Sequence, residues 1–233
     1  MKNNDINISD YRYERKFFIR QLSKYEVKNI INLHPAIFSE IYHQRYVNNI
    51  YFDSFSLNNY RENIEGAKDR IKIRIRWYGE LFGYIEKPIL EIKIKRGLLG
   101  KKISYSLKPF YLTENTKTTD ILKSIINLKE ILLIEFESLI PSLLNRYSRK
   151  YYQSSNKKYR ITVDNEQSFY HINKENNTFL NSYFDNASVI LELKYDQEHD
   201  FGASHITSSF PFRITKSSKY VSGVEKTFQV NYG

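Results

Sequence analysis

Cysteine is absent from the 233-residue sequence, so disulfide bonds, thiolate chemistry and cysteine-ligated zinc are excluded. Only five histidines are present and no H-E-x-x-H motif occurs, which argues against a histidine-based zinc site. The sequence also lacks a G-x-x-x-x-G-K-S/T loop, and this excludes a P-loop nucleotide site.

Glycine and proline are scarce, with eight and five residues, which argues against flexible linkers and low-complexity segments. The longest aliphatic run, residues 131–134, is far too short to span a membrane. The first ten residues contain no apolar core typical of a signal peptide. We therefore expect one domain over residues 1–233 in a cytoplasmic protein that does not itself insert into a membrane.

Negative charge is in short supply. The 36 lysines and arginines outnumber the 26 acidic residues, which gives a net charge of +10. Such a surplus predicts an anionic partner. On charge alone, nucleic acid, an anionic membrane, nucleotides and polyphosphate all qualify.

One strand-like segment carries this charge on a single face. Side chains alternate between the two faces of a strand, so in R-I-K-I-R-I-R-W (70–77) the cations share one face and the apolar residues share the other. Neighbouring like charges at this spacing repel by roughly 1 kcal/mol in water, and by more if they are partly buried. Something negative should therefore face the cations Arg70, Lys72, Arg74 and Arg76.

The same alternation recurs at Glu91, Lys93 and Lys95, and again at Glu192 and Lys194. A solvated sheet face could also carry lysine and arginine. Such a face usually mixes charges, because opposite pairs across strands are stabilising and like pairs are not. We therefore predict an α+β fold in which about eight antiparallel strands close into a β-barrel tunnel, with a basic lumen and with helices packed on the outside.

Hydrophobic periodicity and turn residues place the expected elements along the chain. A capping box at Ser23 and Glu26 begins a helix that ends near Pro35, and a second helix is expected over Thr119–Leu139. Turn-forming residues follow Asp53. The expected strands are Arg12–Ile19, Tyr46–Asp53, Arg70–Tyr78, Ile89–Lys95, Lys102–Leu107, Leu143–Tyr152, Arg160–Asp164, Val189–Tyr195 and Ile214–Val221.

Carboxylates are sparse on the basic faces, and three of them precede a lysine by two residues: Glu14 and Lys16, Glu91 and Lys93, Glu192 and Lys194. Each pair could be an ordinary ion pair, which is worth little when it is exposed. Alternatively, these carboxylates could hold a hard divalent cation beside phosphates.

Aromatic residues are abundant, with 20 tyrosines and 15 phenylalanines, and they are interleaved with basic residues. This composition also suits single-stranded nucleic acid bound by stacking. However, Tyr51 and Phe52 are interpreted as core, and neither an RNP-type motif nor zinc-finger spacing is present. Nucleic acid is therefore not the expected partner.

Several segments together resemble the VTC domain, the polyphosphate polymerase branch of the triphosphate tunnel metalloenzymes. The resemblance extends from about Tyr11 to Val224, and the segments occur in the order of the family. They are Y-E-R-K-F (13–17), N-N-I-Y-F-D-S (48–54), K-I-R-I-R-W-Y-G (72–79), E-I-K-I-K (91–95), R-Y-S-R-K-Y-Y (146–152), R-I-T-V-D (160–164), E-L-K-Y (192–195) and K-S-S-K-Y (216–220).

The resemblance implies a tunnel in which the terminal phosphoryl group of ATP is transferred to polyphosphate with Mn²⁺ or Mg²⁺. By motif position, Glu192 would be the principal metal carboxylate, with Glu14 as a second ligand, and Lys16, Arg74, Arg76 and Glu192 would carry catalysis. The residues that would bind substrate are Lys93, Lys102, Tyr147, Arg149, Arg160, Lys194, Lys216, Ser218 and Lys219.

The first strand departs from the hydrolytic tunnel enzymes, which carry E-x-E-x-K where this chain has Arg12-x-Glu14-x-Lys16. The arginine lowers metal-binding capacity and adds positive charge, which resembles the polymerase branch. A metal-dependent tripolyphosphatase or nucleoside triphosphatase remains an alternative. A binding module for polyphosphate or nucleotides without activity is another. A membrane partner, known for fungal members of the family, is neither predicted nor excluded.

Overall fold

The structure, a computed structural model, describes residues 12–96, 99–118, 121, 138–175 and 177–229. Strands dominate these ranges. The strands are β1 (Arg12–Ile19), β2 (Ser39–Ser54), β3 (Arg70–Tyr78), β4 (Gly83–Ile85), β5 (Ile89–Arg96), β6 (Leu99–Ser106), β7 (Phe110–Leu112), β8 (Leu139–Gln153), β9 (Tyr159–Tyr170), β10 (Ser182–Asp185) and β11 (Val189–Asp196). The helices are α1 (Lys24–Asn32), α2 (Asn58–Glu65), a 3₁₀ turn at Gln197–His199, α5 (Asp200–Ser208) and α6 (Lys219–Gln229).

Eight strands follow one another in a single antiparallel sheet in the order β1-β11-β9-β8-β2-β3-β5-β6. β10 pairs with β9 beside this path, and β4 and β7 form a separate two-stranded sheet. The α+β class and the antiparallel arrangement predicted from the sequence are therefore confirmed.

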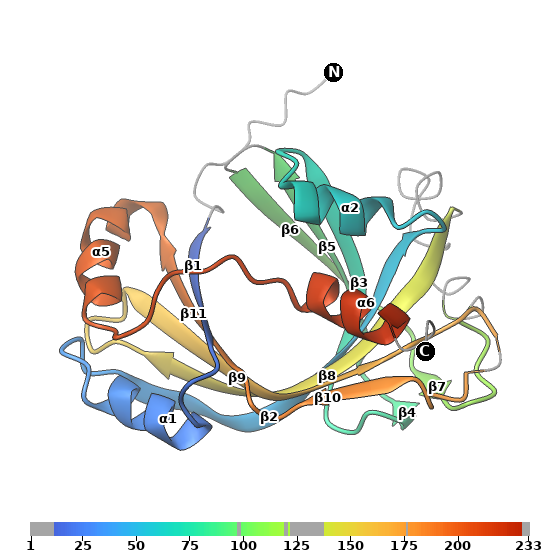
Figure 1. Ribbon diagram of the computed structural model, residues 1–233, viewed down its shortest axis with the longest axis horizontal. Coiled ribbons are helices and arrows are strands. Elements are labelled where there is room, and N and C mark those ends of the chain that lie inside the picture. The colour runs from blue at the N-terminus through green and yellow to red at the C-terminus, as the bar shows by residue number, and fades with distance from the viewer. Residues whose placement is uncertain (1–11, 97–98, 119–120, 122–137, 176, 230–233) are drawn as a thin grey trace.

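The sheet curls strongly, so one of its faces is concave (Figure 1). The curl brings Lys93 of β5 within 3.2 Å of Glu14 of β1, although these strands are far apart in the sheet. Within the described residues, however, no backbone ladder joins β1 to β6. The closed barrel therefore remains a prediction, whereas the curled sheet is observed.

The convex face is apolar, as strand alternation predicted. Ile73, Ile75 and Trp77 of β3 lie in one buried cluster with Leu90 and Ile92 of β5. Consecutive outward side chains of neighbouring strands meet there, which removes their apolar surface from water. The cationic residues between them are thereby directed to the concave face.

Helices α1 and α5 cover the part of the convex face near β1 and β11 (Figure 1). Val27 and Ile31 of α1 pack in the same cluster as Phe17 and Leu191. The capping box is confirmed, because the Glu26 amide donates to the Ser23 hydroxyl and the Ser23 amide donates to the Glu26 carboxylate. The expectation of outer helices holds for these two.

Helix α6 lies on the concave side, across the interior of the curl (Figure 1). Tyr220 and Val224 pack against Leu143 and Phe169 of the sheet. The helix lies so close that a Cβ at Gly223 would be 2.4 Å from a methyl carbon of Leu143. A glycine is therefore required for this contact.

The strand expected over Ile214–Val221 is wrong. Ile214 makes one isolated bridge with Phe17, and the chain then enters α6 at Lys219. The β-branched residues of this stretch favour a strand locally. Burial of Tyr220 and Val224, four residues apart on one helix face, outweighs that preference.

After Asp53 the sequence indicated only a turn, but the structure has helix α2 there. The Asp53 carboxylate accepts hydrogen bonds from the amides of Asn59 and Tyr60, both at 2.9 Å. It thus satisfies donors at the start of α2 from outside the helix.

The helix expected over Thr119–Leu139 falls almost entirely outside the described residues, apart from Ile121, Ser138 and Leu139. Leu139 begins β8. Within the described ranges, no helix has the length and apolar character needed to cross a membrane.

Candidate active site

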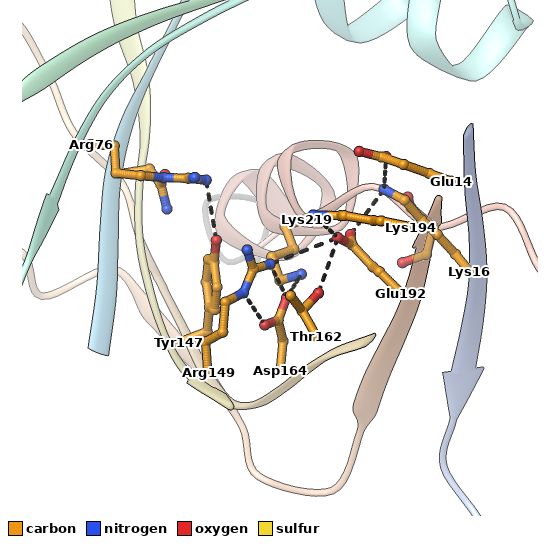
Figure 2. A network of polar contacts seen from close by, with 12 residues as sticks. Glu14, Lys16, Arg76, Tyr147, Arg149, Thr162, Asp164, Glu192, Lys194 and Lys219 are labelled. Carbon is orange, nitrogen blue, oxygen red and sulfur yellow. Dashed lines mark hydrogen bonds and ion pairs between the residues drawn. The ribbon is translucent and has the colours of Figure 1, made fainter. Parts of the chain in front are cut away.

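The concave face gathers charged side chains from seven strands and from the start of α6. Figure 2 shows many of them pointing toward one another from β1, β3, β8, β9, β11 and α6. We call this set the basic concave face. Its cations are Lys16, Lys72, Arg74, Arg76, Lys93, Lys102, Arg149, Lys194 and Lys219, and its carboxylates are Glu14, Glu91, Asp164 and Glu192.

Glu192 on β11 is surrounded by cations. Its carboxylate lies 3.1 Å from the ammonium groups of both Lys16 and Lys194, and 3.8 Å from the Arg149 guanidinium (Figure 2). Burial alone would raise the pKa of Glu192, but the charges of Lys16 and Lys194 outweigh burial and hold this pKa well below its ordinary value. Glu192 is therefore ionised at neutral pH.

Asp164 on β9 forms the most enclosed ion pair of the site. Its side chain is 0% exposed and accepts two hydrogen bonds from Arg149, at 2.5 and 2.6 Å, and one from Lys219 at 2.5 Å. Burial raises the pKa of Asp164, but the charges of Arg149 and Lys219 reverse this and lower it. Asp164 thus ties α6 to β8 and β9.

Glu91 on β5 holds the arginines of β3. It pairs with Arg74 at 2.6 Å, with Arg76 at 3.4 Å and with Lys102 at 2.5 Å. The register explains this choice, because Arg74 lies directly opposite Glu91. The pairing of Glu91 with Lys93 that the sequence suggested is not among these contacts, whereas Glu14 with Lys16 and Glu192 with Lys194 lie within 3.9 and 3.1 Å.

Lys72 lies opposite another cation, because the register of β3 and β5 pairs it with Lys93. Its ammonium donates to the Ser218 hydroxyl at 3.1 Å. Burial, reinforced by the charges of Lys16 and Arg70, lowers the pKa of Lys72 to about 7. A bound anion would favour the charged form of this lysine.

Arg76 is held by neutral groups as well. Its guanidinium donates to Asn49 at 2.9 Å and to the Tyr147 hydroxyl at 3.3 Å. Asn49 in turn donates to Asn145 at 2.8 Å, and the Asn145 amide nitrogen has no partner among the described residues. This network fixes the direction of the guanidinium without neutralising it.

Two residues predicted to line the tunnel take no part in the described ion pairs of this set. The side chains of Arg160 and Lys216 are exposed. Arg160 lines a cavity of about 260 Å³ together with Arg149 and Lys194, at one end of the basic concave face. Among the described contacts, neither residue pairs with a carboxylate of the site.

Sequence reasoning gave no site role to Asp164 or Asn49, and it took Tyr51 to be core. Tyr51 is buried, but it lies on the concave side, where its hydroxyl accepts from Arg74 at 3.2 Å. The available signal was strand alternation, because Asp164 shares a face with Arg160 and Thr162.

A divalent metal of the kind that the family uses can be tested against the residues present. The described part of the chain holds no group of three or more carboxylate or histidine side chains able to bind a metal. Glu14 and Glu192 both flank the Lys16 ammonium, at 3.9 and 3.1 Å. Two carboxylates fit an ion such as Mg²⁺ that takes its other ligands from phosphate and water.

Comparison with solved structures shows the fold. A candidate adenylate cyclase from Vibrio parahaemolyticus shares 9% identity with a TM-score of 0.52, covering 92% of this chain and 98% of that one. A candidate adenylyl cyclase from Hippeastrum, described as having a dominant triphosphatase activity, shares 10% with a TM-score of 0.53, covering 91% and 96%. The PH1819 protein from Pyrococcus horikoshii shares 12% with a TM-score of 0.51, covering 94% and 99%.

No curated protein matches this sequence. The sequence model of the VTC domain, however, matches residues 11–228. This range includes every element of the curled sheet and all of the basic concave face. The chain therefore belongs to the VTC domain family.

Proposed function

We propose that this protein is a polyphosphate polymerase, which transfers the terminal phosphoryl group of ATP to a polyphosphate chain held on the basic concave face. The observation that carries the proposal is the charge imbalance of that face, where, among the described residues, nine basic side chains meet four carboxylates. The uncompensated positive charge calls for a highly charged anion. Membership of the VTC domain family supports the same class of substrate.

The chemistry requires positioning and charge neutralisation more than covalent participation by the protein. An oxygen of the terminal phosphate of the acceptor attacks the γ-phosphorus of ATP. A new P–O–P bridge forms, the bond from the γ-phosphorus to the β,γ-bridging oxygen breaks, and ADP leaves with that oxygen. Arg74 and Arg76, anchored by Glu91, Asn49 and Tyr147, hold charged phosphate oxygens in place during this step.

A divalent ion bound by Glu14 and Glu192 would neutralise charge on the phosphates. Lys16 lies between these carboxylates and would contact the same phosphate oxygens. The charge of Glu192 raises the pKa of Lys16, so its ammonium is charged at neutral pH.

The acceptor is proposed to be phosphate and not water because none of the four described carboxylates of the site is suited to act as a general base, and a bound polyanion keeps Lys72 in its charged form, which cannot accept a proton. An effective base has a pKa near the working pH. Despite burial, neighbouring cations lower the pKa of each of the four carboxylates, Glu14, Glu91, Asp164 and Glu192. Water would need a proton acceptor, whereas a terminal phosphate oxygen is already ionised.

The test is to incubate the purified protein with ATP and Mn²⁺ and to separate the products by chain length on a gel. Growth of long polyphosphate together with release of ADP is the expected result. Orthophosphate as the only phosphate product would overturn the proposal in favour of a triphosphatase. Tight triphosphate binding without turnover would overturn it in favour of a binding module.

A further inference from the structure

One end of the basic concave face is lined by tyrosines around a single arginine. The Arg45 guanidinium lies 4.6 Å from the ring centre of Tyr78, 4.8 Å from that of Tyr151 and 5.4 Å from that of Tyr42. We call these four residues the aromatic rim. The rings of Tyr42 and Tyr151 meet edge to face at 5.7 Å.

The backbone at this point is irregular. The pairing of β2 with β8 shifts register between Glu40 and Tyr42, and again between Tyr42 and Arg45. Such bulges redirect side chains and are frequent next to functional sites. Tyr42 is 57% exposed and Tyr78 is 43% exposed. Their rings therefore remain available to a ligand.

The aromatic rim continues into the cationic site. Tyr42 and Tyr151 line the cavity of about 260 Å³ that also contains Arg149, Thr162 and Lys194. Arg149 lies 5.9 Å from the ring centre of Tyr151 and 5.1 Å from that of Tyr147, deeper in the site. Thr162 and Lys194 both contact Glu192. A single ligand could thus extend from the tyrosines to Glu192.

The chemistry of this end differs from that of the phosphate site. The face of an aromatic ring carries partial negative charge, so it is a poor surface for phosphate and a good one for a flat base. Aromatic rings together with arginine bind bases by stacking. Arg149 and Lys194, at the inner side of the cavity, are suited to the phosphates.

We propose that the aromatic rim is the subsite for the base of the nucleoside triphosphate, so that the nucleotide enters at this end with its phosphates directed toward Glu192. This inference rests on the proposed function for the identity of the ligand. The alternative is that the tyrosines only hold Arg45 and the irregular part of β2 in place.

The test compares two ligands that share a triphosphate but differ in the base. Binding of ATP and of inorganic tripolyphosphate is measured by titration calorimetry with wild-type protein, Tyr42→Ala and Tyr42→Phe. Loss of stacking should weaken ATP binding about tenfold in Tyr42→Ala. The affinity for tripolyphosphate should stay within about twofold, and Tyr42→Phe should behave as wild type because the ring is kept.

The matched control is Tyr84→Ala. Tyr84 is 56% exposed and pairs with Tyr111 at 5.1 Å on the separate sheet of β4 and β7. The Tyr84→Ala variant should have the same affinities for ATP and for tripolyphosphate as wild-type protein. An equal loss for ATP and tripolyphosphate in Tyr42→Ala, or no loss for either, would overturn the base subsite. Failure of wild-type protein to bind either ligand would instead overturn the proposed function.

Discussion

Glu14 on β1 and Lys93 on β5 form an ion pair with 3.2 Å between the carboxylate oxygen and the ammonium nitrogen, although five strands separate β1 from β5 in the sheet. The contact is possible only because the sheet curls until the concave sides of its distant strands meet. Charges from seven strands therefore face one shared volume.

We expect Glu14→Gln to change metal dependence and anion affinity in opposite directions. Loss of a metal ligand should raise the Mn²⁺ concentration for half-maximal activity by about tenfold or more. With EDTA present, tripolyphosphate should bind several-fold more tightly, because Lys93 loses its carboxylate partner. Metal titrations of activity and calorimetry measure the two effects.

The control for Glu14→Gln is Glu86→Gln, which removes an exposed carboxylate that pairs with Lys87. Glu86→Gln should change neither the Mn²⁺ concentration for half-maximal activity nor the affinity for tripolyphosphate. An unchanged Mn²⁺ requirement in Glu14→Gln would remove Glu14 from the metal site.

Arg76→Ala and Lys16→Ala should each lower kcat by roughly a hundredfold or more, because each variant removes a fixed charge from the transferred phosphate. Arg76→Lys should recover little activity, since lysine cannot contact both Asn49 and Tyr147 through a planar group. Thermal melting and circular dichroism check that the variants remain folded.

The matched control is Lys87→Ala, since the Lys87 side chain is 84% exposed and pairs only locally with Glu86. It should retain full turnover. Wild-type kcat in a folded Arg76→Ala or Lys16→Ala protein would contradict the assignment of that residue.

Triphosphate binding should take up a proton at Lys72. Its pKa is lowered to about 7, so in the free protein at pH 8 most Lys72 side chains are neutral. A bound polyanion raises this pKa back toward its ordinary value, so binding adds up to about one proton at pH 8 and much less at pH 6. Calorimetry in two buffers with different ionisation enthalpies gives the number of protons.

Lys72→Met should reduce this uptake at pH 8, whereas Lys68→Met, which changes an exposed lysine before β3, should not. The same proton number in Lys72→Met as in wild type would show that another group titrates.

Asp164→Asn should destabilise the protein by about 3–5 kcal/mol, because it leaves Arg149 and Lys219 close together without their shared carboxylate. Tripolyphosphate should restore more stability to this variant than to wild type, since phosphate can neutralise both cations. Urea unfolding with and without tripolyphosphate measures both effects.

Asp200→Asn is the comparison, because Asp200 is half-exposed and pairs with Arg15 at the surface. Asp200→Asn should lower the free energy of unfolding by less than about 1 kcal/mol. Equal destabilisation of the two variants would mean that the burial of Asp164 does not increase the contribution of its ion pairs to the free energy of unfolding.

Local rules predicted much of this molecule. The alternation in Arg70–Tyr78 placed isoleucines and cations on opposite faces, and β3 has those bounds and those faces. The capping box of Ser23 and Glu26 could be predicted from the sequence because its two residues are three positions apart in the chain. Such features are encoded within a few residues.

Features that depend on contacts between residues far apart in the chain could not be predicted from the sequence. A strand was expected over Ile214–Val221, but α6 begins within this range at Lys219, and its helical form depends on packing of Tyr220 and Val224 against Leu143 and Phe169. An ion pair of Glu91 with the nearby Lys93 was one of two interpretations of the sequence, but the register of β3 and β5 sets Glu91 opposite Arg74.

By itself, the sequence determined which side of each strand is cationic and which is apolar, because that depends only on the two-residue period of a β-strand. Only the tertiary structure decided which charges meet. Asp164 lies between Arg149 and Lys219, and Glu14 contacts Lys93, because strand register and the curl of the sheet bring together residues that are 15 to 79 positions apart in the chain. The register of the strands and the curl of the sheet depend on packing over the whole sheet. A pattern of a few neighbouring residues therefore does not predict them.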